Sequence, residues 1–99
     1  MNISSTEKEG HILLQIDGRV DTNTSTALLN EILEAFDKKR KLVLDFEKVS
    51  YISSAGLRSL LIGQKTAAGK KAEMELINVS GTVRTVLDSV GFSKILTIK

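Results

Sequence analysis

Two adjacent serines, Ser53 and Ser54, are the residues of this chain best suited to chemistry. They precede Leu57 and Leu60, which begin a helical apolar pattern, and they follow a β-prone stretch. A serine at a helix N-terminus either accepts a hydrogen bond from a free backbone N–H or points into solvent. A phosphate placed there would meet free N–H groups and the positive end of the helix dipole. The junction therefore predicts either a helix cap or a modifiable hydroxyl.

The two interpretations differ in what these serines do. In the structural one, Ser53 or Ser54 only caps the helix and Gly56 lets neighbouring backbone pack closely, and spacing alone favours this interpretation. In the functional one, the Ser54 hydroxyl is accessible, and its phosphorylation changes the surface charge by about −1.5 to −2 while leaving the backbone intact. Such a change would suit a binding switch.

Asp21 stands at the other prominent polar junction, just before a second helical pattern. Its side chain, with those of Asn23 and Thr24, is of the type that caps helices, and capping is the favoured interpretation. In an open α/β sheet, partner surfaces gather at the carboxyl ends of the strands, where both junctions should fall.

Catalysis fits these residues poorly. A Gly-x-Ser-x-Gly elbow is missing because Ile52 occupies its first glycine position, and Gly-rich phosphate loops are absent. The one histidine, His11, falls in an expected hairpin and would have to reach the opposite site to act as a base. The sequence predicts a protein that is not an enzyme.

Composition excludes further classes of function. The 99 residues contain no cysteine and one histidine, which excludes disulfides, Cys-ligated metals and multi-histidine metal sites. A net charge of +2 with 4% aromatic residues argues against a nucleic-acid partner. No apolar run approaches the ~20 residues of a membrane span, and the first residues lack the apolar core of a secretory signal. We therefore expect a cytoplasmic protein without membrane insertion.

Hydrophobic spacing predicts the elements that position these residues. An alternation of strands and helices implies a mostly parallel sheet, so we expect a single α/β domain over residues 1–99, with three amphipathic helices and an N-terminal antiparallel hairpin. The expected order is β-β-α-β-α-β-α-β: strands at 2–7 and 12–17, a helix at 23–38, a strand at 42–46, a loop at 47–53, a helix from Ser54 to about Gly69, a strand at 74–79, a helix capped by Ser80 and ending before Gly91, and a strand at 95–98.

Three segments in this order resemble the STAS domains, the family of anti-sigma-factor antagonists. The first runs from Asp45 to Leu57, a strand ending in Asp followed by a spaced Val, a serine pair and a Gly-Leu that opens a helix. The second is Gly-Arg-Val-Asp, ending at Asp21, and the third runs from Asp88 to Ile95, where a helix ends at Gly before the last strand. The resemblance spans essentially the whole chain.

The resemblance implies a phosphorylation-switched regulator of transcription. The unphosphorylated protein would bind an anti-sigma factor that is also a serine kinase, and so release a sigma factor. Phosphorylation of Ser54 would release the kinase, and a PP2C-type phosphatase would restore the free serine. ATP belongs to the kinase, so no cofactor is expected in this chain. The partner-binding residues implied are Asp21, Thr22, Asn23, Ser53, Ser54, Ala55, Gly56 and Leu57.

One residue departs from the family pattern. Many antagonists have Asp immediately before the phosphorylated serine, whereas this chain has Ser53, a second hydroxyl beside the expected acceptor. An alternative interpretation is therefore a constitutive adaptor subunit of a transporter or stress-signalling complex, which uses the same surface without phosphorylation.

Overall fold

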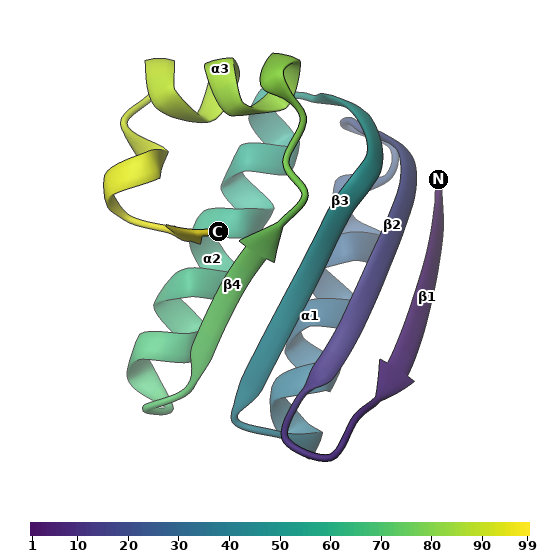
Figure 1. Cartoon of the computed structure of the whole chain (residues 1–99), viewed down its shortest axis with the longest axis vertical. Helices are drawn as coiled ribbons and strands as arrows, with labels where there is room; N and C mark the ends of the chain where they lie inside the picture. The colour runs from purple at the N-terminus through teal and green to yellow at the C-terminus, as the bar shows by residue number, and fades with distance from the viewer.

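The computed structural model describes residues 1–99 and contains one five-stranded mixed sheet with three α-helices. The strands lie in the order β1-β2-β3-β4-β5; β1 is antiparallel to β2, and the other neighbours are parallel (Figure 1). This confirms the predicted α/β fold and its N-terminal hairpin. The elements are β1 (Asn2–Glu7), β2 (Ile12–Val20), α1 (Ser25–Lys38), β3 (Lys41–Ile52), α2 (Ser54–Gly69), β4 (Glu73–Ile77), α3 (Gly81–Ser89), the 3₁₀ turn η1 (Phe92–Lys94) and β5 (Thr97–Ile98).

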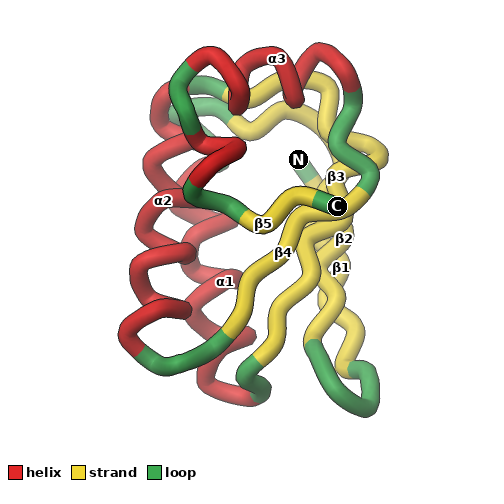
Figure 2. The backbone as a smooth tube through the Cα atoms, turned by 60° about the vertical axis from the view of Figure 1, so that its left-hand side comes forward, coloured by secondary structure: helices red, strands yellow, loops and turns green.

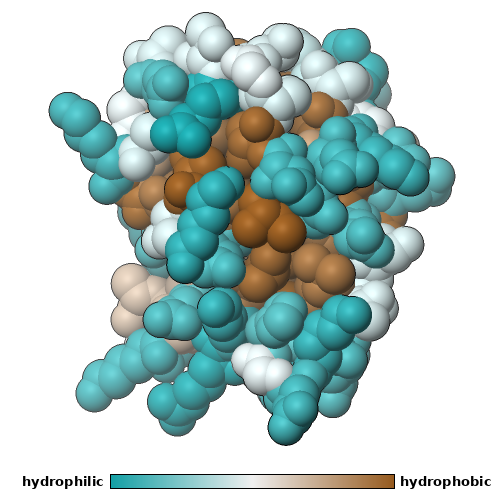
Figure 3. Space-filling view, viewed as in Figure 1, coloured by the Kyte–Doolittle hydropathy of each residue, from teal (hydrophilic) through white to brown (hydrophobic).

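Helices α1 and α2 lie side by side against one face of the sheet (Figures 1 and 2). The core between these layers forms because alternate strand residues, such as Leu14 in β2 and Leu44 in β3, are buried together with Leu28 of α1 and Leu60 of α2. Helix α3 crosses the end of the sheet at which β2, β3 and β4 finish. The opposite face, here called the open face, shows an apolar area surrounded by hydrophilic side chains (Figure 3). No helix combines the length and apolar character that a membrane crossing requires.

The predicted loop at 47–53 is wrong, because β3 continues to Ile52. Its apolar residues Phe46, Val49 and Ile52 recur every three residues, which does not match the two-residue period of a regular strand. The pairing with β2 shifts twice, and at each shift β3 has one residue more than β2. Each extra residue turns the following side chains over, so all three apolar residues are buried.

Two other strands are shorter than expected. β4 ends at Ile77 because Asn78 takes a left-handed conformation with φ of 57°, which asparagine tolerates better than most residues. β5 begins at Thr97 rather than at residue 95. The backbone N–H groups of Ile95 and Leu96 both donate to the Phe92 carbonyl, at 3.0 and 2.8 Å, so this stretch closes the 3₁₀ turn instead of pairing with β4.

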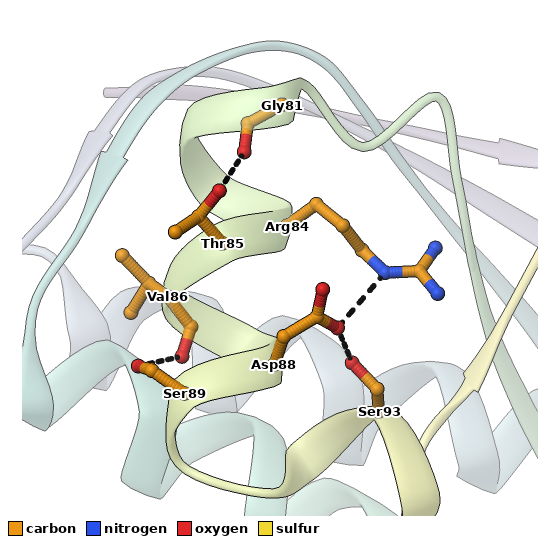
Figure 4. Close-up of polar contacts among 7 residues, drawn as sticks. All are labelled: Gly81, Arg84, Thr85, Val86, Asp88, Ser89 and Ser93. Atoms are coloured by element: carbon orange, nitrogen blue, oxygen red, sulfur yellow. Dashed lines mark hydrogen bonds and ion pairs between the residues drawn. The ribbon is translucent and has the colours of Figure 1, made fainter.

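Polar contacts define the start of α3 and link its end to η1, and Figure 4 shows those at the end. Ser80 caps the helix as predicted, because its hydroxyl oxygen accepts from the Val83 N–H at 3.4 Å. At the other end the Asp88 carboxylate accepts from the Ser93 hydroxyl and from Arg84 Nε, the latter at 3.2 Å. These two hydrogen bonds, that of Ser93 first, lower the pKa of Asp88 below its usual value.

Candidate functional site

The two polar junctions lie next to each other at the end of the sheet. Val20, the residue before Asp21, pairs with Ile52 as the last pair of β2 and β3. The Ser53 N–H then donates to the Val20 carbonyl at 2.8 Å, which carries the contact between the two segments past the end of the strands. The sequence prediction that both junctions share one end of the sheet is therefore correct.

Gly56 sets how closely α2 approaches these strand ends. A Cβ at this position would lie 2.7 Å from Ile52 Cγ1, 2.8 Å from Val20 Cγ1 and 3.0 Å from the Val20 carbonyl oxygen. Contacts this short essentially do not occur, so any larger residue would push the first turn of α2 away from β2. The expected close packing of backbone at Gly56 is confirmed.

Ser53 and Ser54 have different surroundings. Ser53 is half-buried in an extended conformation, and its hydroxyl oxygen accepts from the Gly56 N–H at 3.3 Å, so it is the N-cap of α2. Ser54 is the first helical residue; its side chain is exposed, and its hydroxyl makes no hydrogen bond within the chain. The structural interpretation therefore holds for Ser53, and it leaves the Ser54 hydroxyl free.

Asp21 organises the turn that leads into α1. Its Oδ1 accepts from the N–H groups of Asn23 at 3.0 Å and Thr24 at 3.2 Å, while the Thr24 hydroxyl donates to the Arg19 carbonyl at 2.9 Å. Asp21 is therefore not the N-cap of α1, which is Thr24 without a side-chain cap hydrogen bond; the Asp21 carboxylate instead closes the turn that precedes the helix. Because Asp21 holds the turn in place, Thr22 and Asn23 are left exposed at its tip.

The eight predicted contact residues divide by exposure. Thr22, Asn23 and Ser54 are exposed, and Asp21, Ser53 and Ala55 are half-buried; together these six form what we call the Ser54 surface. Gly56 and Leu57 are buried beneath it. His11 directly precedes β2, whereas Ser53 and Ser54 come directly after β3. Because β2 and β3 are parallel, the imidazole lies at the other end of the sheet from Ser54. The one imidazole of the chain is therefore not placed to act as a general base for the Ser54 hydroxyl.

Sequence inspection missed Ser59, which connects the two helices behind the site. Its buried hydroxyl donates to the Ser25 carbonyl at the start of α1, at 2.9 Å, and to the Ala55 carbonyl within α2, at 3.3 Å. The sequence does not indicate that Ser59 bonds to the Ser25 carbonyl, because the two residues are 34 positions apart.

A second missed pair lies on strands β2 and β3 beside the junction. The Arg19 guanidinium carbon lies 4.2 Å from the centre of the Tyr51 ring, a cation–π arrangement. Tyr51 is 41% exposed, so the stacked pair remains at the surface. Only the register shift in β3 places these two residues opposite each other, and the sequence does not show that shift.

These features describe a small α/β domain whose candidate site is an exposed hydroxyl at a helix start, beside backbone contacts between two strand ends. The pattern that defines the STAS domain matches residues 2–99, and the chain belongs to this family.

Named relatives agree with this assignment. The anti-sigma-B factor antagonist of Listeria monocytogenes is 32% identical, over 100% of this chain and 90% of that protein. Among solved structures, an anti-sigma factor antagonist from Mycobacterium paratuberculosis has a TM-score of 0.86 at 22% identity, covering 98% of this chain and 83% of the other. The anti-sigma factor antagonist SpoIIAA in its unphosphorylated form has a TM-score of 0.78 at 17% identity, covering 99% and 87%.

Proposed function

We propose that this chain is an anti-sigma factor antagonist controlled by phosphorylation of Ser54. With Ser54 unmodified it binds an anti-sigma factor that is also a serine kinase, and with Ser54 phosphorylated it releases that partner. The observation that carries the proposal is the free, exposed hydroxyl of Ser54 beside a serine already used as the helix cap. The names of its relatives support the same function.

The position of Ser54 explains how one phosphate could act without damaging the fold. Ser54 is exposed at the first residue of α2, the positive end of the helix dipole, where a phosphate is stabilised. A contact that buries this surface against a partner would lose the hydration of the phosphate and meet its charge of about −1.5 to −2. The modification would thus weaken binding while the domain stays folded.

The exposed part of the Ser54 surface supplies the partner contacts in this proposal. Thr22 and Asn23 at one tip and Ser54 at the other would touch the kinase directly. Gly56 and Leu57, being buried, would act by holding the start of α2 in position rather than by contact. The exposed serine would also be within reach of a PP2C-type phosphatase that returns the protein to its binding form. The chain itself would perform no catalysis.

Isothermal titration calorimetry with the candidate kinase tests whether a negative charge at position 54 weakens binding. Ser54→Asp should weaken binding at least tenfold, about 1.4 kcal/mol, because it places a charge in a desolvated contact. The matched control is Ser5→Asp, which makes the same substitution at an exposed residue of β1, a strand that does not contribute to the Ser54 surface. Equal affinities for the wild type and Ser54→Asp would contradict the switch and favour a constitutive adaptor.

The acceptor is tested by phosphosite mapping after incubation with the candidate kinase and ATP. We expect phosphate on Ser54 alone: Ser54→Ala should abolish incorporation and Ser53→Ala should retain it. Phosphate on Ser53 in the wild-type protein, or none on either serine, would overturn the assignment.

A further inference from the structure

Strand β1 is a free edge of the sheet. Its six residues, Asn2–Glu7, pair with β2 on one side, and no element lies beyond them on the other (Figure 1). The unpaired N–H and C=O groups of such an edge are a template for another strand. From Asn2 to Thr6 the strand carries no charged residue and no proline.

The opposite edge of the same sheet is protected by its shortness, and a lysine follows both edge strands, Lys8 after β1 and Lys99 after β5. β5 has only two residues, and it is followed by Lys99, which forms an ion pair with Glu75 at 3.4 Å. Short edge strands and lysines are among the features that prevent edge-to-edge association. β1 is three times as long as β5, and its pairing with β2 is continuous, without a bulge that would twist the edge away.

The β1 edge is also held in place at its beginning. Gly18 of β2 adopts φ of 117°, and a Cβ there would lie 3.3 Å from the Met1 Cα, so the start of β1 runs close over the glycine. Ile3 is partly buried and packs against the core, which fixes the middle of the strand. The chain therefore presents an ordered strand rather than a loose terminus.

We propose that the β1 edge pairs antiparallel with β1 of a second copy of this chain, which joins the two sheets around a two-fold axis. An antiparallel pair of identical strands is self-complementary, because each residue meets the same partner in both copies. In a pairing centred on Ser4, Asn2 of each copy faces Thr6 of the other, so amide and hydroxyl groups meet and no like charges do. From Asn2 to Thr6 the strand offers no charge that selects a charged partner, and in this register each of these five residues faces another of them in the second copy.

The size of the edge predicts weak association. A six-residue strand spans about 20 Å. Such a seam is expected to bury less than the roughly 800 Å² per partner of a stable interface. The dimer should therefore form only at high protein concentration. This inference does not depend on the phosphorylation of Ser54.

Sedimentation velocity of the whole chain, from about 10 µM to about 1 mM, tests the proposal, since this range covers the dissociation constants of weak complexes. The average mass of the wild type should rise towards that of a dimer with increasing concentration. Ser4→Lys should raise the dissociation constant at least tenfold, because two lysines would face each other across the axis. The matched control is Gln15→Lys on β2, which pairs directly with Ser4 and adds the same charge one strand away from the edge.

A wild type that remains monomeric at every concentration would overturn the proposal. So would a Ser4→Lys variant that associates like the wild type, or a Gln15→Lys variant that loses association equally, since the open face and not the edge would then be the contact. Hydrogen exchange gives a second measurement that needs no variant. Amides of residues 2–7 in the wild type should exchange more slowly at high than at low concentration, and unchanged exchange would contradict the β1 seam.

Discussion

Ser53 and Ser54 show how neighbouring residues of one type can have separate roles. The hydroxyl oxygen of Ser53 accepts a hydrogen bond from the Gly56 N–H, and Ser54 exposes its hydroxyl to solvent. The sequence narrows the site to these two residues, but it cannot distinguish them, because the choice depends on which residue remains extended and which takes the first helical conformation.

This division of roles predicts different effects on stability. Ser53→Ala should lower the free energy of unfolding by about 1 kcal/mol through loss of the cap. Ser54→Ala should change it by less than about 0.5 kcal/mol, because an exposed hydroxyl without a partner is removed. Urea unfolding of the two variants checks this. A larger loss for Ser54→Ala than for Ser53→Ala would show that the cap is assigned to the wrong serine.

Gly56 permits a second prediction at the scale of one residue. Gly56→Ala should destabilise the protein by about 1–3 kcal/mol, because its methyl group meets Val20 and Ile52 at overpacked distances. Gly81→Ala is the control, since a Cβ there has nothing within 4 Å. Thermal melts should show a clear loss for the first variant and no loss for the second.

At the scale of the elements, the helices follow from sequence patterns and the strand ends do not. The apolar spacing and the caps at Ser53 and Ser80 define α2 and α3 locally. The extension of β3 depends on two register shifts against β2, and the shortening of β5 depends on the turn closed by the Phe92 carbonyl. These features come from partners distant in sequence or from local competition for hydrogen bonds, which hydrophobic spacing alone does not report.

The link between α1 and α2 is tested by removing the Ser59 hydroxyl. Ser59→Ala should lower the free energy of unfolding by about 1 kcal/mol, because it removes the one hydroxyl proton that the Ser25 and Ala55 carbonyls share. Thr66→Ala is the control within the same helix, where the hydroxyl bonds only to the Ile62 carbonyl of its own preceding turn. Chemical unfolding that shows equal effects for both variants would argue against a bridge between the helices.

The contact between α3 and η1 should depend on pH. The pKa of Asp88 is lowered in the folded state by the hydrogen bonds of Ser93 and Arg84 (Figure 4), so its stabilising effect is present above the unfolded pKa and is lost as pH falls through the folded one. Asp88→Asn should therefore melt below the wild type at pH 7, and this difference should shrink below about pH 4. Glu34→Gln, at an exposed carboxylate without a polar partner, should show no such convergence.

At the scale of the whole molecule, the charge balance would make the proposed phosphorylation of Ser54 effective. The net charge is only +2, so a phosphate of about −1.5 to −2 cancels most of it. The net charge can be counted from the sequence. That a phosphate on Ser54 would change the charge of one small surface can be seen only from the fold.

A global measurement separates switching from unfolding. Ser54→Asp should keep the melting temperature and the far-UV circular dichroism of the wild type, because a carboxylate at the first helical residue of α2 is compatible with the helix dipole. A melting temperature well below that of the wild type would mean that loss of partner binding reports a damaged fold rather than a charge at the contact.

The hydrogen bond from the Ser53 N–H to the Val20 carbonyl is made by backbone atoms alone, and the approach at Gly56 needs only the absence of a side chain. The position of the Ser54 hydroxyl therefore does not depend on which residues stand at positions 22 and 23, since the side chains of Thr22 and Asn23 are exposed. Mutation can vary this tip while the Ser54 hydroxyl stays where it is. Under the proposed function, variants of this tip could differ in which kinase they bind. All of them would keep the same serine available for phosphorylation.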